Sequence, residues 1–171
     1  VDPARSAIVF RGAYMGRPFE GRFNDWTADI RFDPDTPPSS DAPIPARILV
    51  AVKTGSASTG EPYFDENGSQ GDWVAAFQHP EAVFEVNEGV FKDSATQYEA
   101  TGVLVLKGVR HPLRLPFTLD IAGNEARMHA EIGMSRLALG VGRATLAAEQ
   151  GDAEWVADEV RLVVDVVATR Q

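Results

Sequence analysis

Hydrophobic residues alternate with polar ones through three consecutive runs in the middle of the chain, between Tyr98 and Met134. Alternation with a period of two indicates β-strands that bury one face and leave the other more exposed. Short links at residues 107–112 and 122–125 contain Gly, Pro or Asn, and such links join antiparallel neighbours. We therefore predict a three-stranded antiparallel meander with one apolar side. Its expected inward positions are Tyr98, Ala100, Gly102, Leu104 and Leu106; Leu113, Leu115, Phe117, Leu119 and Ile121; and Ala126, Met128, Ala130, Ile132 and Met134.

Further runs with the same period lie on both sides of this meander. Residues 19–32 alternate in two opposite phases that meet near Asn24 and Asp25. One extra residue there predicts a β-bulge in a long, bent strand. The run from Val160 to Ala168 is the most regular in the chain. The other predicted strands cover residues 6–10, 46–52 and 82–91.

One short helix is predicted between the strands, after the glycine-rich segment 54–71. Over residues 69–77 the aromatic side chains of Trp73 and Phe77 lie four residues apart, which would place them on one face of a helix. Asp72 is the expected N-cap of this helix, and Pro80 prevents it from continuing.

About eight antiparallel strands and one short helix predict an all-β fold. An eight-stranded sheet with one apolar face closes best as an antiparallel barrel, because closure removes unpaired edges. Such a barrel is either filled by side chains or holds one small ligand. Several inward positions carry only Gly or Ala, which favours an apolar cavity over a solid core. These positions are Gly21, Ala28, Ala46, Ala100, Gly102, Ala126, Ala130 and Ala168.

The composition narrows the class of protein. A length of 171 residues with 44% hydrophobic residues predicts a single domain, residues 1–171, with its own core. A net charge of −9 with dispersed Lys and Arg argues against a nucleic acid partner. The absence of cysteine excludes disulfides, zinc–thiolate sites and thiol catalysis. No apolar run is long enough to span a membrane. Because residues 1–5 lack the apolar core of a signal peptide, we expect a processed chain or a piece of a longer one.

No set of residues predicts an enzyme or a metal site. A hydrolase needs a nucleophile, a base and an orienting acid, and the sequence contains no Gly-x-Ser-x-Gly motif. The histidines His79, His111 and His129 are far apart in sequence, and we expect each to be solvated or to cap a turn or helix. His129 and Glu131 share one strand face, which makes them at most a weak surface metal pair.

Two further polar residues have alternative roles. Asp65 is expected to be a solvated loop carboxylate rather than a catalytic acid. Arg136 lies beside an apolar run, so it would either contact the polar head group of a ligand or pair with an acid and hold the barrel together. The second role is favoured.

Motifs along the whole chain resemble the YceI family of bacterial lipid-binding proteins. The most specific match is Gly102 to Pro116, which resembles the family's Gly-x-Leu-x-Leu-x-Gly and Pro-x-x-Leu-Pro elements. The chain departs from the common pattern at residues 54–71, which form a longer segment here. The other matching segments are Ser6 with Val9 and Phe10, Phe19–Phe23, Ile30–Pro34, Gly71–Trp73 with Phe77, Pro80 and Phe84, and Ser135–Arg136 with Gly140–Gly142.

The resemblance implies a lipocalin-like antiparallel barrel, export to the periplasm, and an interior that binds a long isoprenoid-type or fatty chain. Some family members are joined to, or encoded near, a membrane b-type cytochrome. A quinone is therefore a sensible ligand, and such a cytochrome a candidate partner. A homodimer is left open, and no cofactor is expected beyond a bound isoprenoid lipid or quinone. We expect the ligand to enter by a mouth near residues 54–71 and 140–142.

The predicted ligand site consists of inward apolar side chains, because burial of apolar area drives the binding of such a chain. Methionine adapts well to an irregular ligand. The alternative is a solid barrel that serves as an interaction module, the soluble periplasmic part of a membrane redox assembly. The residues predicted to line the ligand site are Phe19, Phe23, Trp26, Phe32, Val50, Phe77, Phe84, Leu104, Phe117, Met128, Ala130 and Ile132.

Overall fold

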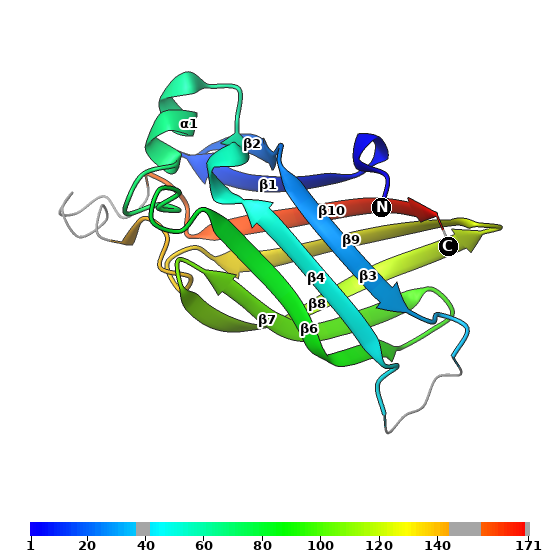
Figure 1. Cartoon of the computed structure of the whole chain (residues 1–171). Coiled ribbons are helices and arrows are strands. Elements are labelled where there is room, and N and C mark those ends of the chain that lie inside the picture. Colours follow the sequence, from blue (N-terminus) through cyan, green and yellow to red (C-terminus); the bar gives the residue numbers. More distant parts are fainter. Residues whose placement is uncertain (37–41, 144–154, 170–171) are drawn as a thin grey trace.

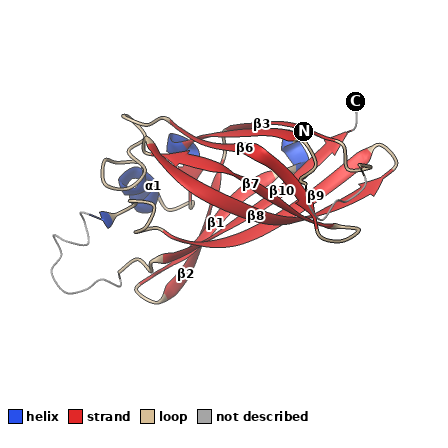
Figure 2. Cartoon of the chain, turned by 90° about the horizontal axis from the view of Figure 1, so that it is seen from below, coloured by secondary structure: helices blue, strands red, loops and turns tan. Residues whose placement is uncertain are grey.

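The structure, a computed structural model, describes residues 1–36, 42–143 and 155–169, apart from the side chains of Phe32 and Asn87. Its strands form one ten-stranded antiparallel sheet that curls around an apolar interior (Figures 1 and 2). The order across the sheet is β3-β4-β6-β7-β8-β9-β10-β1-β2-β5. The predicted all-β antiparallel class is confirmed, with ten strands in place of eight. The predicted closure is wrong, because β3 and β5 form the two edges of a curled sheet and no ladder joins them among the described residues.

The elements follow one another with short connections over most of the described chain. The strands are β1 (Ala7–Tyr14), β2 (Arg17–Phe23), β3 (Trp26–Phe32), β4 (Ala46–Lys53), β5 (Ala57–Ser58), β6 (Glu81–Lys92), β7 (Gln97–Leu106), β8 (Val109–Ala122), β9 (Glu125–Ser135) and β10 (Glu159–Thr169). The helical segments are the 3-10 turns η1 (Pro3–Arg5) and η2 (Thr54–Ser56) and the α-helix α1 (Pro62–Gly68).

The predicted meander is confirmed as β7, β8 and β9. Ala100 lies opposite Leu115, and Phe117 lies opposite Ala130. The family-like spacing of glycine in β7 has a steric reason, since a side chain at Gly102 would collide with the carbonyl oxygen of Glu85 in β6. The close approach of the two backbones therefore requires glycine at this position.

The predicted bulge at Asn24 and Asp25 is wrong, because the chain turns a corner there. β2 pairs with β1 and β5, whereas β3 pairs with β4. The opposite phases of residues 19–32 thus come from two strands with different partners. Backbone hydrogen bonds from Asn24 N to Ser56 O (3.1 Å) and from Lys53 N to Asp25 O (2.9 Å) hold the corner against η2.

The predicted helix over residues 69–77 is also wrong, and α1 precedes it. Pro62 occupies the first turn of α1, a position where proline is favoured. After α1 the chain forms turns, in which the N–H of Ala75 bonds to Gln70 and that of Ala76 to Ser69, instead of residues four positions back. Ala75 also has a φ of +50°, which no α-helix accommodates. Asp72 consequently has no helix to cap.

The two ends of the curled sheet differ. Helix α1 lies at one end, whereas both termini lie at the other (Figures 1 and 2). A cluster of buried side chains from β4, β6, β7, β8 and β9 fills part of the interior between these ends. Its members include Ile48, Phe84, Val86, Leu115 and Phe117.

Candidate functional site

A cavity of about 960 Å³ occupies the rest of the interior. Every strand from β1 to β10 except β5 contributes to its wall, and most of the side chains that line it are aliphatic or aromatic. Their inward orientation follows from the period-two alternation of the strands. A volume of this size suits one ligand molecule rather than a water network. The apolar cavity predicted from the small inward residues is therefore present.

The cavity opens at the end where the termini lie. Lining residues at this end are exposed to solvent, and they come from the first residue, the end of β3, the β8–β9 hairpin and the end of β10. At the opposite end the lining residues Leu106, Met134 and Leu139 are half-buried. The predicted mouth near residues 54–71 and 140–142 is wrong, because neither segment lines the cavity. The exposed lining residues are Val1, Arg31, Asp33, Ile121, Asn124 and Thr169.

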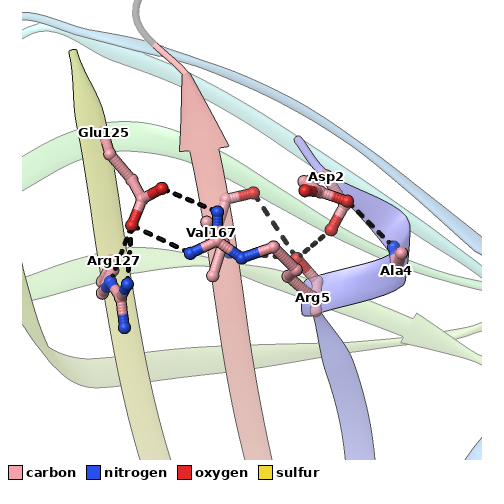
Figure 3. Close-up of polar contacts among 7 residues, drawn as sticks. Asp2, Ala4, Arg5, Glu125, Arg127 and Val167 are labelled. Atoms are coloured by element: carbon pink, nitrogen blue, oxygen red, sulfur yellow. Dashed lines mark hydrogen bonds and ion pairs between the residues drawn. The ribbon is translucent and has the colours of Figure 1, made fainter.

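A polar network borders this mouth (Figure 3). Glu125, which lines the cavity, accepts hydrogen bonds from Arg5 at 2.7 and 2.9 Å and from Arg127 at 2.8 Å. The hydrogen bonds from Arg5 and then Arg127 lower the pKa of the Glu125 carboxyl to about 2. The N-terminal turn is also tied to β10, because Asp2 N donates to Val167 O at 2.7 Å. The Glu125 carboxylate is therefore ionised at neutral pH and held at the rim of the mouth by the two arginines.

Aromatic rings pack under α1 at the other end. Phe64 of α1 stacks on Phe19 with ring centroids 6.5 Å apart and meets the edge of Tyr14 at 5.1 Å. Phe19 in turn contacts Phe10 at 6.5 Å. Phe19 therefore packs beneath α1 instead of lining the cavity. The aromatic cluster of Phe10, Tyr14, Phe19 and Phe64 explains why α1 can cover this end without a long helix.

Asp65 fastens α1 to the barrel and is not the solvated loop carboxylate that the sequence predicts. Its carboxylate accepts hydrogen bonds from Thr59 N at 2.6 Å, Thr59 Oγ1 at 2.8 Å and Ser58 Oγ at 2.7 Å. The backbone bond from Thr59 is the main cause that lowers the pKa of Asp65. Since Ser58 belongs to β5, the carboxylate links the helix to the edge of the sheet.

Arg136 holds loops together near the same end and does not line the cavity. Only 5% exposed, it donates to the carbonyl oxygens of Val141 (2.9 Å), Gly142 (3.2 Å), Val156 (2.7 Å) and Ala157 (3.1 Å). Burial lowers its pKa. These contacts agree with the structural role favoured from the sequence, but the predicted pairing with an acid is wrong, because the hydrogen-bond partners are carbonyl groups.

Some of the predicted ligand-site residues line the cavity and others do not. For Phe32, which belongs to β3, the side chain lies outside the described residues. Phe77 is 95% exposed, because it lies in the turns that replace the predicted helix, and its predicted place on the wall is wrong. Ala130 and Ile132 pack in or against the buried cluster rather than on the cavity surface. The predicted residues that line the cavity are Phe23, Trp26, Val50, Phe84, Leu104, Phe117 and Met128.

The histidines occupy three different environments. His129 lies on the outer face, with Nδ1 2.7 Å from Asp165 Oδ1, while its expected metal partner Glu131 accepts a hydrogen bond from Arg161. The carbonyl oxygen of His79 accepts a hydrogen bond from Thr54 Oγ1 at 2.8 Å. His111 differs from the sequence-based expectation of a solvated turn residue: it belongs to β8, in phase with the inward residues, and its Nε2 atom is buried.

Sequence reasoning missed His111 because Pro112 suggested a turn. β8 pairs with β9 only from Phe117 onward, so along Pro112 to Pro116 one side of the strand has no ladder partner among the described residues, and proline is tolerated there. The signal that identifies this histidine is the period of two, which extends back from Leu113 to His111.

The part of the chain that the structure describes contains no group of three or more His, Asp and Glu side chains arranged to hold a metal ion. Among the same residues, no helix is both long and apolar enough to cross a membrane.

The chain is similar to several curated bacterial proteins. A UPF0312 protein of Vibrio campbellii is 29% identical over 80% of this chain and 70% of its own length. UPF0312 proteins of Vibrio parahaemolyticus and Pseudomonas paraeruginosa are 29% and 31% identical over 71% and 69% of this chain. The matched part spans only 61% and 58% of the length of these two relatives.

Solved structures share the fold. Burkholderia cenocepacia BcnA has a TM-score of 0.84 and 25% identity, with 99% of each chain covered. A polyisoprenoid-binding domain from Saccharophagus degradans has a TM-score of 0.69 and 11% identity, with 97% of this chain and 94% of that domain covered. A family model, the YceI-like domain, matches residues 1–168, and the chain therefore belongs to the YceI family.

Proposed function

We propose that this protein binds and carries a long apolar lipid of the isoprenoid type, a polyprenyl chain or a quinone, without catalysing a reaction. The observation that supports this function most directly is the apolar cavity of about 960 Å³, which is open at one end and covered by α1 at the other. A solid interaction module, the alternative favoured by a filled barrel, has no use for such a space.

The chemistry of the wall supports a hydrocarbon ligand. Between the mouth and the covered end, the described wall consists of alkyl and aromatic side chains such as Val50, Leu104 and Met128. Burial of apolar area contributes about 25 cal/mol per Å², so a branched hydrocarbon chain gains affinity along its whole length. Charged lining residues are few: Arg31, Asp33 and Glu125 lie at the mouth, whereas Asp29 lies in the middle of β3 and pairs with Arg31 at 3.1 Å.

The polyisoprenoid-binding description of the Saccharophagus domain agrees with this proposal, because the two folds correspond over almost their whole length. As further parts of the proposal, the exported protein acts in the periplasm and, with a quinone as its ligand, serves a membrane b-type cytochrome. A homodimer stays a prediction.

Native mass spectrometry with organic extraction tests the function. Protein purified from its host is expected to carry an excess mass that extracts as an isoprenoid species, and delipidated protein is expected to take up an added quinone or polyprenol. Ala28→Trp places an indole in the cavity from β3 and should abolish uptake. Thr27→Trp places the same group on the exposed outer face of that strand and should leave uptake unchanged. Equal uptake by both variants, or no uptake by the parent protein, contradicts the proposal.

A further inference from the structure

His111 carries a buried polar atom that the fold leaves unsatisfied. Its Nε2 atom is shielded from solvent and has no hydrogen-bond partner among the described residues. A buried donor or acceptor without a partner destabilises the fold, and native proteins therefore rarely retain one without a reason.

The position of His111 relates this atom to the cavity. The residue lies on the inner face of β8, directly opposite Leu104 of β7. Its other same-face neighbours are Leu113, two residues further along β8, and Leu106, diagonally across the ladder. All three leucines line the cavity at its covered end. The imidazole thus stands within the inward layer of side chains, next to the cavity although not on its present surface.

We propose that His111 is the anchor for a neutral carbonyl or hydroxyl head group, which the ligand inserts into the covered end while its tail extends toward the mouth. This inference rests on the proposed function. A neutral imidazole has one donor and one acceptor nitrogen, so Nε2 bonds a quinone carbonyl as a donor, or a prenol hydroxyl in either tautomer. A rotamer change of Leu104 or Leu106 gives the head group access to the ring.

The charges along the cavity agree with a neutral head group. A phosphate at the covered end would lose its hydration among leucine side chains, which costs far more than one hydrogen bond returns. At the mouth, the guanidinium groups already have acidic partners: Arg31 pairs with Asp29 at 3.1 Å, and Arg5 and Arg127 bond Glu125. An anionic lipid would therefore either lose its hydration at the covered end or compete with carboxylates for the guanidinium groups at the mouth.

The test compares four ligands of matched chain length on delipidated protein: a quinone, a prenol, a prenyl phosphate and a linear isoprenoid hydrocarbon. The variants are His111→Phe, which keeps a planar ring without a polar atom, and His111→Gln, which restores a hydrogen-bonding group. His129→Phe, on the exposed outer face of β9, is the matched control. Thermal unfolding of each unliganded variant verifies that the barrel is intact.

The expected result is a selective loss. His111→Phe should weaken binding of the quinone or the prenol about tenfold, the scale of one buried hydrogen bond, and leave hydrocarbon binding unchanged. His111→Gln should recover part of that loss, and the control should match the parent protein. The prenyl phosphate should bind more weakly than the prenol.

If His111→Phe affects the hydrocarbon as much as the ligands with a polar head group, or affects neither, His111 is not the anchor, although the carrier function still stands. If the parent protein binds none of the four ligands, the carrier function itself fails.

Discussion

The rings of Phe19 and Phe64 stack with an interplanar angle of 14° and join a β-strand to the only α-helix among the described residues. Phe19 stands on β2, whereas Phe64 comes from a segment that follows β5 by only a few residues. Together with the bonds from Ser58 and Thr59 to Asp65, this stack seats α1 over one end of the barrel. The contact therefore holds α1 against β2 at this end of the sheet.

Phe64→Ala should loosen this closure. Because Phe64 is half-buried, we expect a loss of about 2 kcal/mol in the free energy of unfolding, less than the cost of about 3–5 kcal/mol for a fully buried phenylalanine. Urea unfolding measures the loss, and amide hydrogen exchange should show reduced protection over residues 58–68. Tyr63→Ala removes the neighbouring ring, which is 70% exposed, and should change neither quantity much. Unchanged exchange in Phe64→Ala would mean that α1 is held without the stack.

Arg136→Ala should destabilise the protein more than it weakens ligand binding. The guanidinium satisfies four buried or half-buried carbonyl groups and lies over the ring of Trp73, 5.3 Å from its centroid. Removing it should cost about 3 kcal/mol in urea unfolding, because the carbonyl groups are left unpaired. Arg136→Lys should rescue only part of this loss, since an ammonium lacks the planar fork of donors. The exposed Arg143, which donates to Leu137 O, gives the control Arg143→Ala. A large loss of affinity with little loss of stability would instead assign Arg136 to the ligand.

Trp26 should report ligand binding by its fluorescence. Its indole lines the cavity, so a bound quinone lies within contact distance and should quench its emission. In a quinone titration, Trp26→Phe should lose most of the ligand-dependent change. Trp155→Phe should retain this change, because Trp155 is 44% exposed and packs against Tyr14 near the covered end. Equal quenching in the two variants would place the quinone outside the cavity.

The strands could be predicted because their pattern depends on local geometry. Positions such as Leu115, Phe117 and Leu119 show a period of two that any half-buried strand imposes, and the structure buries them as expected. The two opposite phases around Asn24 also contained real information. They marked a change of partner strand, which only the tertiary arrangement distinguishes from a bulge.

The site was harder to predict because it depends on contacts between distant residues. The two ends are built from the packing of Phe64 on Phe19 and from the bonds of Arg5 to Glu125, pairs that are far apart in sequence. Phe77 was predicted inward from a helical spacing, but the backbone of Ala75 adopts a positive φ and turns the segment outward. Half-buried wall positions such as Trp26 and Met128 could be predicted from the sequence, because their place on the cavity wall depends only on the phase of the alternation in their strands.

Glu125 should make stability depend on pH in the acidic range. Its carboxyl has a pKa of about 2 in the folded protein, below the ordinary value of 4.5, because Arg5 and Arg127 bond its ionised form. A carboxyl whose pKa is lowered by folding stabilises the folded state fully above its unfolded pKa and loses that effect as the pH falls toward the folded pKa.

The parent protein should therefore be more stable than Glu125→Gln at pH 7, and the difference in the free energy of unfolding should shrink between about pH 4.5 and pH 2. Urea unfolding of the two proteins across this range measures the difference. A difference between parent and Glu125→Gln that stays constant down to pH 2 would show that the arginine contacts at the rim do not hold the carboxylate in solution.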